Sequence, residues 1–164
     1  MTELDSWHAQ VSEDIIEPER PIIDPHHHLW RMGTPYELED LWADTKAGHN
    51  ITGTVFIECG AEYRTDGPVA LQPVGETEYV VAQAKQARKG EAPGKPPILG
   101  IVSHADLTLG AAVVDVLEAH QESAEGLLRG IRHSTAFYPD PPAVDRYAGR
   151  VAELMLQPSF REGF

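Results

Sequence analysis

The chain has one cysteine and few basic residues, and each shortage argues against a class of protein. Cys59 cannot form an internal disulfide by itself, and such low cysteine usage is typical of a reducing, cytoplasmic compartment. The 164 residues include 13 Lys and Arg against 26 Asp and Glu, which gives a formal net charge of −13. Because nucleic acids and anionic membrane surfaces are bound through clustered Lys and Arg, we expect neither as a partner.

Long hydrophobic runs are also missing from the sequence. No apolar stretch approaches the roughly 20 residues that cross a bilayer. The first 20 residues are acidic and polar, without the basic and apolar segments of a secretory signal. We therefore expect an N-terminal arm over residues 1–20 and one cytoplasmic domain over residues 21–164.

Segments rich in β-branched residues alternate with segments of helical periodicity. The expected strands are residues 21–23, 53–58, 98–103 and 127–132, and the expected helices are residues 36–47, 76–89, 113–121 and 141–154. This alternation predicts an α/β protein with a parallel sheet and helices packed on it. The pattern is compatible with a doubly wound sheet or with part of a (β/α)8 barrel.

Polar residues follow each expected strand. They are Asp24, His26 and His28 after the first, Glu58 and Cys59 after the second, His104 and Asp106 after the third, and Arg132 and His133 after the fourth. Barrel enzymes draw their chemistry from the C-terminal ends of several strands, whereas doubly wound sheets often carry a Gly-rich phosphate loop, which this sequence lacks. We therefore favour the N-terminal half of a TIM (β/α)8 barrel, with about four βα units.

The run Pro-Ile-Ile-Asp-Pro-His-His-His, residues 21–28, carries the strongest chemical signal. Side chains alternate along a strand, so Asp24, His26 and His28 are expected on one face. Neutral imidazole is the commonest protein ligand of zinc-like ions, and two rings two residues apart can hold one divalent metal. A solvated loop, a chance cluster and a tag remnant are the competing explanations of three consecutive histidines.

The motif Asp24-x-His26-x-His28-Leu29-Trp30 resembles the opening of the amidohydrolase superfamily, in its amidohydrolase-related (amidohydrolase 2), lactonase-like branch. Residues 53–58, 98–106 and 129–133 are similar to that branch in the same order. The resemblance implies a (β/α)8 barrel that hydrolyses lactones or similar cyclic esters and amides by attack of water on the carbonyl. It also implies a divalent metal, zinc or similar, on His26 and His28, although some relatives work without a tightly held metal.

The resemblance also suggests roles for the other site residues. Arg132 is similar to a substrate-anion arginine, which implies a small carboxylated substrate, and His133 is a further catalytic candidate. Trp30 and His104 are candidates for substrate contact. Without a metal, His26 and His28 would donate hydrogen bonds to the developing oxyanion. His120, in the last turn of the third expected helix, is assigned to the helix end rather than to the site.

The family's later metal ligands and its general-base aspartate have no counterpart in this sequence. We expect them beyond residue 164, in a barrel truncated here before its fifth strand. A half-barrel leaves two sheet edges unpaired, so it should aggregate, pair with another half or be marginally stable, and a homo-oligomer is one form that such pairing would take. Two alternatives stay open: a non-oxidative decarboxylase of the same superfamily, and an inert fragment that only binds metal.

Overall fold

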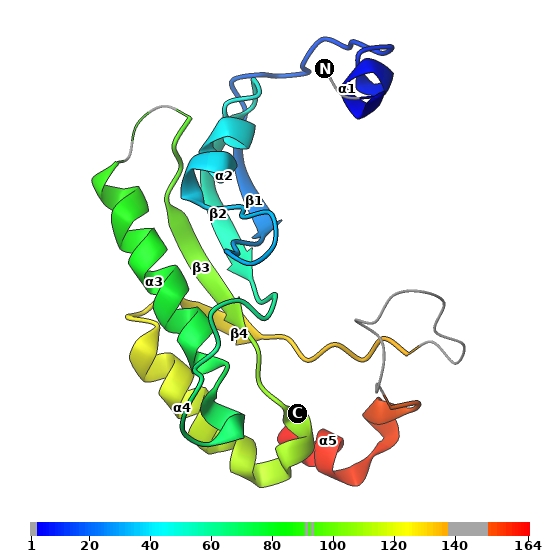
Figure 1. Cartoon of the computed structure of the whole chain (residues 1–164), viewed down its shortest axis with the longest axis vertical. Coiled ribbons are helices and arrows are strands. Elements are labelled where there is room, and N and C mark those ends of the chain that lie inside the picture. The colour runs from blue at the N-terminus through cyan, green and yellow to red at the C-terminus, as the bar shows by residue number, and fades with distance from the viewer. Residues whose placement is uncertain (1–2, 91, 93, 138–150) are drawn as a thin grey trace.

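The computed structural model describes residues 3–90, 92, 94–137 and 151–164. At its centre is a sheet of four parallel strands, which are β1 (Pro21–His27), β2 (Asn50–Ile57), β3 (Ile98–Ser103) and β4 (Leu128–Ile131). The strands lie side by side in the order β1-β2-β3-β4 (Figure 1). The expected α/β architecture with a parallel sheet is therefore confirmed.

The strand order has no reversal. A doubly wound sheet reverses its order at a switch point, where later strands are added on the other side of the first. Here each strand pairs with the next one in sequence, so the crossovers advance in one direction along the sheet. Within the described residues β1 pairs only with β2, and β4 pairs only with β3. Both outer edges of this sheet are thus unpaired in the part of the chain that the structure describes.

Helices connect successive strands. α2 (Leu38–Thr45) follows β1, α3 (Val74–Lys89) follows β2 and α4 (Val113–Ser123) follows β3; the 3-10 turns η1 (Val69–Leu71) and η2 (Leu107–Ala112) precede α3 and α4. α2 begins with a capping box, because Glu37 and Asp40 each accept the other's backbone N–H. These helices confirm the first three expected ones, with small shifts at their ends.

The C-terminal part of the chain contains η4 (Leu154–Leu156) and α5 (Pro158–Gly163). The fourth expected helix, residues 141–154, lies mostly outside the described residues. Residues 151–153 of that range are described and are not helical, and Val151 is 50% exposed, so the expected helix is wrong at its C-terminal end. Phe160 of α5 is buried in a second small core with Leu107 of η2.

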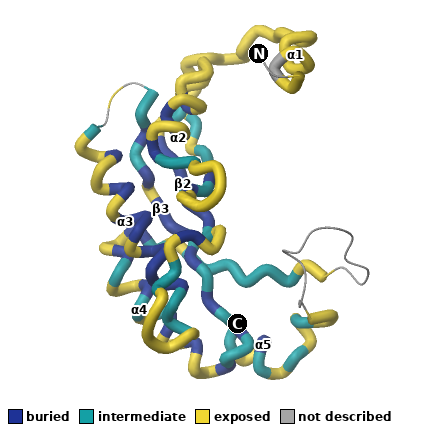
Figure 2. The backbone as a smooth tube through the Cα atoms, viewed as in Figure 1, coloured by how far each residue is buried: buried dark blue, intermediate teal, exposed yellow. Residues whose placement is uncertain are grey.

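The main core lies on one face of the sheet, beneath the helices (Figure 2). Phe56 of β2 and Ile98 and Ile101 of β3 are fully buried there. The helix residues in the same cluster are Leu38, Leu41, Trp42, Tyr79, Val80, Val81, Ala84 and Ala87. The periodic apolar stripes of α2 and α3 therefore meet the β-branched and aromatic residues of the central strands, as expected for helices packed on a parallel sheet.

Buried hydrogen bonds tie α3 and α4 to the end of β3. Ser103 Oγ lies 2.7 Å from Thr77 Oγ1, and Thr77 Oγ1 lies 2.8 Å from Nδ1 of His120. His120 Nε2 donates to the backbone carbonyl of His104 over 2.9 Å, so Nδ1 of the neutral ring accepts from Thr77. His120 is fully buried, and burial lowers its pKa. Although it lies in the last turn of α4 as expected, its side chain is an internal brace that holds the residue after β3.

Residues 3–20 form an arm that leads away from the sheet (Figure 1). The arm contains α1 (Glu3–His8), and its large apolar side chains Trp7, Val11 and Ile16 are exposed. Within the arm, Ile15 packs over Gly48, and the backbone carbonyl of Glu19 accepts a hydrogen bond from the side chain of Asn50. None of the helices in the described ranges is both long enough and apolar enough to cross a membrane.

Candidate active site

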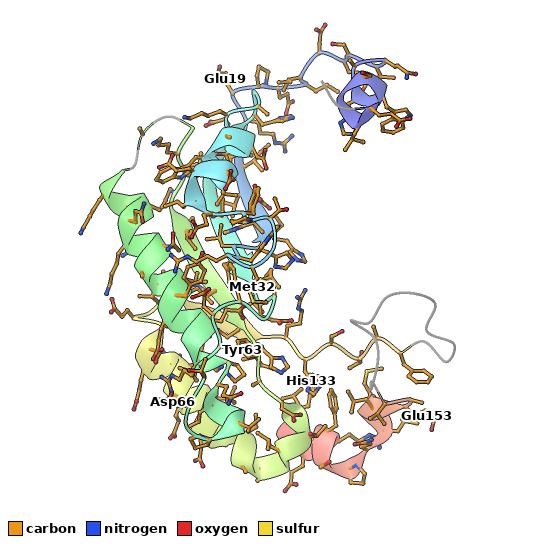
Figure 3. The ribbon with its side chains drawn as sticks, in the orientation of Figure 1. Glu19, Met32, Tyr63, Asp66, His133 and Glu153 are labelled. Atoms are coloured by element: carbon orange, nitrogen blue, oxygen red, sulfur yellow. The ribbon has the colours of Figure 1, made fainter. Side chains whose placement is uncertain are left out.

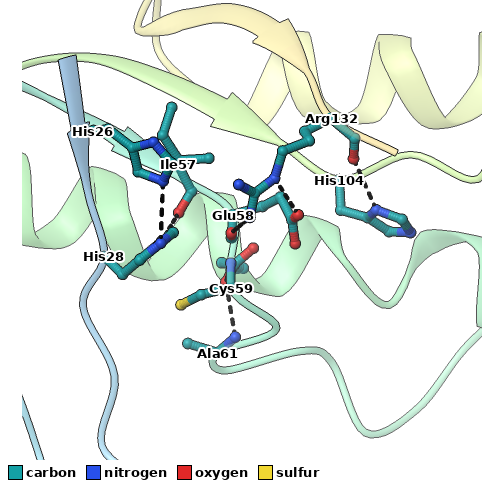
Figure 4. A network of polar contacts seen from close by, with 9 residues as sticks. His26, His28, Ile57, Glu58, Cys59, Ala61, His104 and Arg132 are labelled. Atoms are coloured by element: carbon teal, nitrogen blue, oxygen red, sulfur yellow. Dashed lines mark hydrogen bonds and ion pairs between the residues drawn. The ribbon is translucent and has the colours of Figure 1, made fainter. Parts of the chain in front are cut away.

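The two expected metal ligands of β1 converge. Nε2 of His26 and Nε2 of His28 lie 3.2 Å apart (Figure 4). Nδ1 of His28 lies 2.7 Å from the backbone carbonyl of Ile57, at the end of β2. Because a carbonyl oxygen only accepts, Nδ1 carries the ring proton, and the neutral ring of His28 presents the lone pair of Nε2 toward His26. The neighbouring strand therefore sets both the orientation and the tautomer of His28.

The spacing of these nitrogens suits a shared metal ion. Two imidazole nitrogens bound to one tetrahedral zinc ion at about 2.0–2.1 Å lie about 3.3 Å apart. The observed 3.2 Å is close to that value. No group of three or more His, Cys, Asp or Glu side chains in the described part of the chain is arranged to hold a metal. His26 and His28 thus fit as two ligands of a site that needs others.

A β-bulge lies between Asp24 and His27 in β1, although Asp24 lines the same cavity as His26 and His28. β1 pairs Asp24 with Thr54 and His27 with Phe56, so three steps along β1 match two along β2. Thr54 and Phe56 are both fully buried on the helix-covered face, which places Asp24 and His27 on that face too. The expectation that Asp24 shares a face with His26 is therefore wrong. Asp24 instead accepts the backbone N–H of His26 over 3.0 Å and so shapes the bulge.

His27, the middle residue of the triplet, is buried between β1 and α2. Its ring packs edge-on against Phe56 with the ring centroids 5.8 Å apart, and neither ring nitrogen has a hydrogen-bond partner among the described residues. Burial lowers the pKa of His27 to about 4, although the nearby carboxylate of Asp24 acts to raise it. The ring is therefore neutral at pH 7 and stands apart from the other two imidazoles.

Trp30 was expected to contact substrate and lies beside β1. Its indole N–H donates to the backbone carbonyl of Thr34 over 2.6 Å, and its ring stacks on Tyr36 with the centroids 5.2 Å apart. Trp30 lines a cavity of about 510 Å³ that His26 and His28 also line. An aromatic wall therefore adjoins the imidazole pair, on the side of the unpaired edge of β1.

Glu58 holds Arg132 at the ends of β2 and β4. Nε of Arg132 donates to Oε1 of Glu58 over 2.7 Å, and Nη2 donates to the backbone carbonyl of Glu58 over 2.6 Å (Figure 4). The Glu58 side chain is 13% exposed and that of Arg132 is 39% exposed. These two hydrogen bonds fix the orientation of the planar guanidinium, but the N–H groups that make them are no longer available to a substrate. An anionic substrate would share this cation with Glu58.

His104 and His133, which follow β3 and β4, lie together with ring centroids 5.4 Å apart. Nδ1 of His104 lies 3.0 Å from the backbone carbonyl of Arg132 and must donate to it, so Nε2 of the neutral ring is an acceptor. The backbone N–H of Leu107 donates to Nδ1 of His133 over 3.0 Å, so the neutral ring of His133 carries its proton on Nε2. Nε2 of His104 can therefore accept a hydrogen bond, whereas Nε2 of His133 can donate one.

These rings line a pocket of about 360 Å³, large enough for a small molecule. Glu58, Tyr63 and Asp106 also line it, and Figure 3 shows Tyr63 and His133 near each other at this end of the sheet. Burial acts to raise the pKa of Asp106, but hydrogen bonds from the hydroxyl and backbone N–H of Thr108 outweigh it, and the pKa is lowered. Asp106 is thus an ionised acceptor at the pocket wall.

The structure brings the strand-end residues into one network, with Trp30 at its margin. His28 is bonded to Ile57, the next residue Glu58 holds Arg132, and the carbonyl of Arg132 accepts from His104. The histidine pair therefore lies at one end of a row of polar groups and the 360 Å³ pocket at the other.

Glu76 is a buried residue that the sequence analysis did not single out. Its Oε1 accepts the backbone N–H groups of Cys59 and Ala61, over 3.0 and 2.8 Å, whereas its buried Oε2 has no hydrogen-bond partner within the described ranges. Burial raises the pKa of this carboxyl group. An acidic residue in the first turn of a helix is normally read as an exposed partner of the helix dipole, so the sequence held no signal for this internal role. Glu76 shapes the turn that carries Glu58.

Comparisons with known proteins add a distant relative. No protein-family model matches the chain, and no solved structure matches it. The chain is similar to the uncharacterized protein y4mH of Sinorhizobium fredii (strain NBRC 101917 / NGR234), with 29% identity over 166 residues. The match covers 87% of this chain and 48% of the relative, so the chain spans about half the length of the curated protein that it matches.

Proposed function

We propose that this chain is the N-terminal half of a divalent-metal hydrolase of the amidohydrolase-related, lactonase-like type, built on a (β/α)8 barrel. The observation that carries the proposal is the pair of imidazoles at the C-terminal end of β1, with Nε2 atoms 3.2 Å apart and one ring oriented by the carbonyl of Ile57. The strand order without a reversal supports the barrel, in which each strand is added beside the previous one.

In this proposal His26 and His28 hold the ion. When bound, a divalent ion polarises the substrate carbonyl and lowers the pKa of water to about 7. Arg132, oriented by Glu58, binds the carboxylate of a small lactone or similar cyclic ester or amide. The N–H of His133 donates to the substrate, and Nε2 of His104 accepts from it, because their other nitrogens are committed to the backbone.

Metal binding tests the carrying observation directly. Purified protein would be loaded with Zn²⁺ or Co²⁺, and bound metal would be measured by calorimetry and elemental analysis. We expect His26→Ala and His28→Ala each to abolish binding, and His49→Ala, which removes an exposed imidazole outside the site, to leave it unchanged. Binding that persists in both site variants would refute the proposed metal centre.

Hydrolysis is tested separately, with a panel of carboxylated lactones and a parallel assay for release of carbon dioxide. Ring opening supports the lactonase, whereas carbon dioxide release without ring opening supports the decarboxylase. The described residues supply only two converging ligands, and this observation favours a third outcome. Metal binding without either reaction would mean that this chain is an inert metal-binding fragment.

A further inference from the structure

We propose that the 360 Å³ pocket at the ends of β2, β3 and β4 binds a small ligand through a primary ammonium group. The carboxylate of Asp106 and Nε2 of His104 receive this group. The inference rests on the proposed function in one respect, which is that the occupant of the pocket is part of the substrate. It adds an ammonium group to the carboxylate that Arg132 is expected to bind.

The pocket wall carries one negative charge that no nearby cation balances. Its two carboxylates belong to Glu58 and Asp106. Glu58 is paired with Arg132 over 2.7 Å, so these two charges compensate each other (Figure 4). Asp106 is ionised at pH 7, and within the described ranges it has no ion pair with a Lys or Arg side chain. A ligand with one positive charge would therefore complement the wall.

His133 lies close to Asp106 but does not supply this charge. Its Nδ1 is 3.6 Å from Oδ1 of Asp106, a distance at which a protonated ring would form an ion pair. The same Nδ1 accepts the backbone N–H of Leu107 over 3.0 Å, and an accepting ring nitrogen carries no proton. Protonation at Nδ1 would cost that hydrogen bond, so the arrangement favours the neutral ring.

The acceptors in the wall suit the donors of an ammonium group, which has three N–H groups and no acceptor. Nδ1 of His104 donates to the carbonyl of Arg132 over 3.0 Å, which leaves the lone pair of Nε2 for a ligand. Thr108 donates twice to Oδ1 of Asp106, from its backbone N–H and from its hydroxyl. Oδ2 of Asp106 makes no hydrogen bond in the described part of the chain, and the side chain is 46% exposed, so a ligand can reach it.

Tyr63 adds an aromatic wall to the same pocket. Burial raises the pKa of its hydroxyl, and the nearby carboxylate of Glu76 acts in the same direction, so Tyr63 stays a neutral phenol. A neutral aromatic ring attracts a cation through its π-electrons. Tyr63 therefore favours an ammonium group over an anion in this pocket.

The rest of the wall leaves room for the uncharged part of a small ligand. A volume of about 360 Å³ is at the lower end of the range for small-molecule sites. The remaining lining residues are three with hydroxyl groups and three apolar ones, namely Thr108, Ser134, Thr135, Ala136, Val151 and Leu154. A short alkyl chain can pack against the apolar group while the ammonium end lies at Asp106.

Arg132 is not among the residues that line this pocket. A carboxylate placed in the pocket would meet the unbalanced charge of Asp106, whereas a carboxylate at Arg132 would meet a cation. The two charged residues therefore sort the two ends of a ligand. The substrate class that fits both is a small cyclic ester or amide with an amino group in addition to its carboxylate.

Three probes of similar size and different charge test the pocket, namely butylamine, butanol and butyrate. They would be titrated into the purified chain at pH 8, where imidazoles are neutral and alkylamines are charged. Binding would be followed by nuclear magnetic resonance at the ring of His104 and the amide of Thr108. We expect butylamine to bind about fivefold or more tightly than butanol, and butyrate not to saturate the pocket. Butyrate or butanol binding as tightly as butylamine would overturn the proposal, and so would a failure of butylamine to bind.

Two matched variants test the role of the charge. Asp106→Asn removes it but keeps the hydrogen bonds with Thr108, because Asn caps a helical turn as well as Asp does. This variant should lose the preference for butylamine over butanol. Asp115→Asn makes the same charge change at an exposed position of α4 and should keep the preference. An equal loss in both variants would mean that the acidic chain attracts amines in general, and the pocket would be wrong.

Metal binding separates this inference from the proposed function. His26→Ala should abolish metal binding and leave the butylamine titration unchanged. Asp106→Asn should do the reverse, since Asp106 lies outside the imidazole pair. Failure of the metal centre and failure of the ammonium site therefore give different results. Loss of butylamine binding in His26→Ala would show that the two sites are one, which contradicts the inference.

Discussion

Replacing His120 by leucine removes an internal brace and should cost far more stability than its helix-end position suggests. The ring bonds to the hydroxyl of Thr77 over 2.8 Å and to the backbone carbonyl of His104 over 2.9 Å, and it is fully buried. Each buried polar group left without a partner costs about 1–3 kcal/mol. Because leucine fills most of the space, we expect a loss of about 2–5 kcal/mol in the free energy of unfolding.

Urea denaturation followed by circular dichroism measures this loss. The matched control is His8→Leu, which removes an exposed histidine from the last turn of α1 and should change stability by less than about 0.5 kcal/mol. Equal effects of the two substitutions would show that the buried bonds of His120 contribute nothing beyond its place in a helix.

A double-mutant cycle isolates the contact itself. Thr77→Val alone leaves Nδ1 of His120 without its donor, whereas Thr77→Val combined with His120→Leu removes both partners together. The double variant should therefore lose less than the sum of the single losses, by about 1–2 kcal/mol. Losses that add within about 0.5 kcal/mol would refute the hydrogen-bond chain from Ser103 through Thr77 to His120.

Three other predictions concern buried groups and close packing. Burial lowers the pKa of His120 below its unfolded value of 6.5. Below about pH 6.5 the unfolded state therefore binds more protons than the folded state, and the free energy of unfolding should fall as the pH falls. His120→Leu should make the free energy of unfolding, measured by denaturation between about pH 5 and 7, less dependent on pH. His27→Phe replaces two unpartnered ring nitrogens in an apolar site and should stabilise the protein by about 1–2 kcal/mol in thermal denaturation at pH 7, whereas destabilisation would mean that the ring has a partner there. Gly75→Ala should destabilise the protein by about 1–3 kcal/mol despite the better helix propensity of alanine, because the new Cβ would lie 2.5 Å from the backbone oxygen of Glu62. The control is Gly130→Ala, which should be nearly neutral because a Cβ at Gly130 has open space around it.

Much of the fold could be predicted because its signals are local. The β-branched run at residues 98–103 is β3 with the expected bounds, and the helices after the first three strands follow from apolar spacing and glycine stops. The strand-end position of Arg132 and His104 was also visible in the sequence. What the pattern left open was the order of the strands, because a doubly wound sheet and a barrel share the same alternation along the chain.

The candidate site was harder to predict where geometry departs from the regular period. Alternation alone placed Asp24 beside His26, but one extra residue in β1 changes the face of every residue before it. Glu76 reads as a surface acid at a helix start, yet it bonds to the turn after β2. The engagement of Arg132 by Glu58 joins residues 74 positions apart, and no local pattern encodes such a contact.

The sequence by itself determined the four strands, the first three helices, the excess of acidic residues and the spacing of two alternate imidazoles behind an apolar run, since these depend on composition and on spacing within a few residues. Only the tertiary structure decided that the sheet runs in order without a reversal, that Ile57 sets the tautomer of His28, and that His27 faces the core. The physical reason is that strand order, bulges and hydrogen bonds between strands are set by long-range packing, which acts only when distant segments come together.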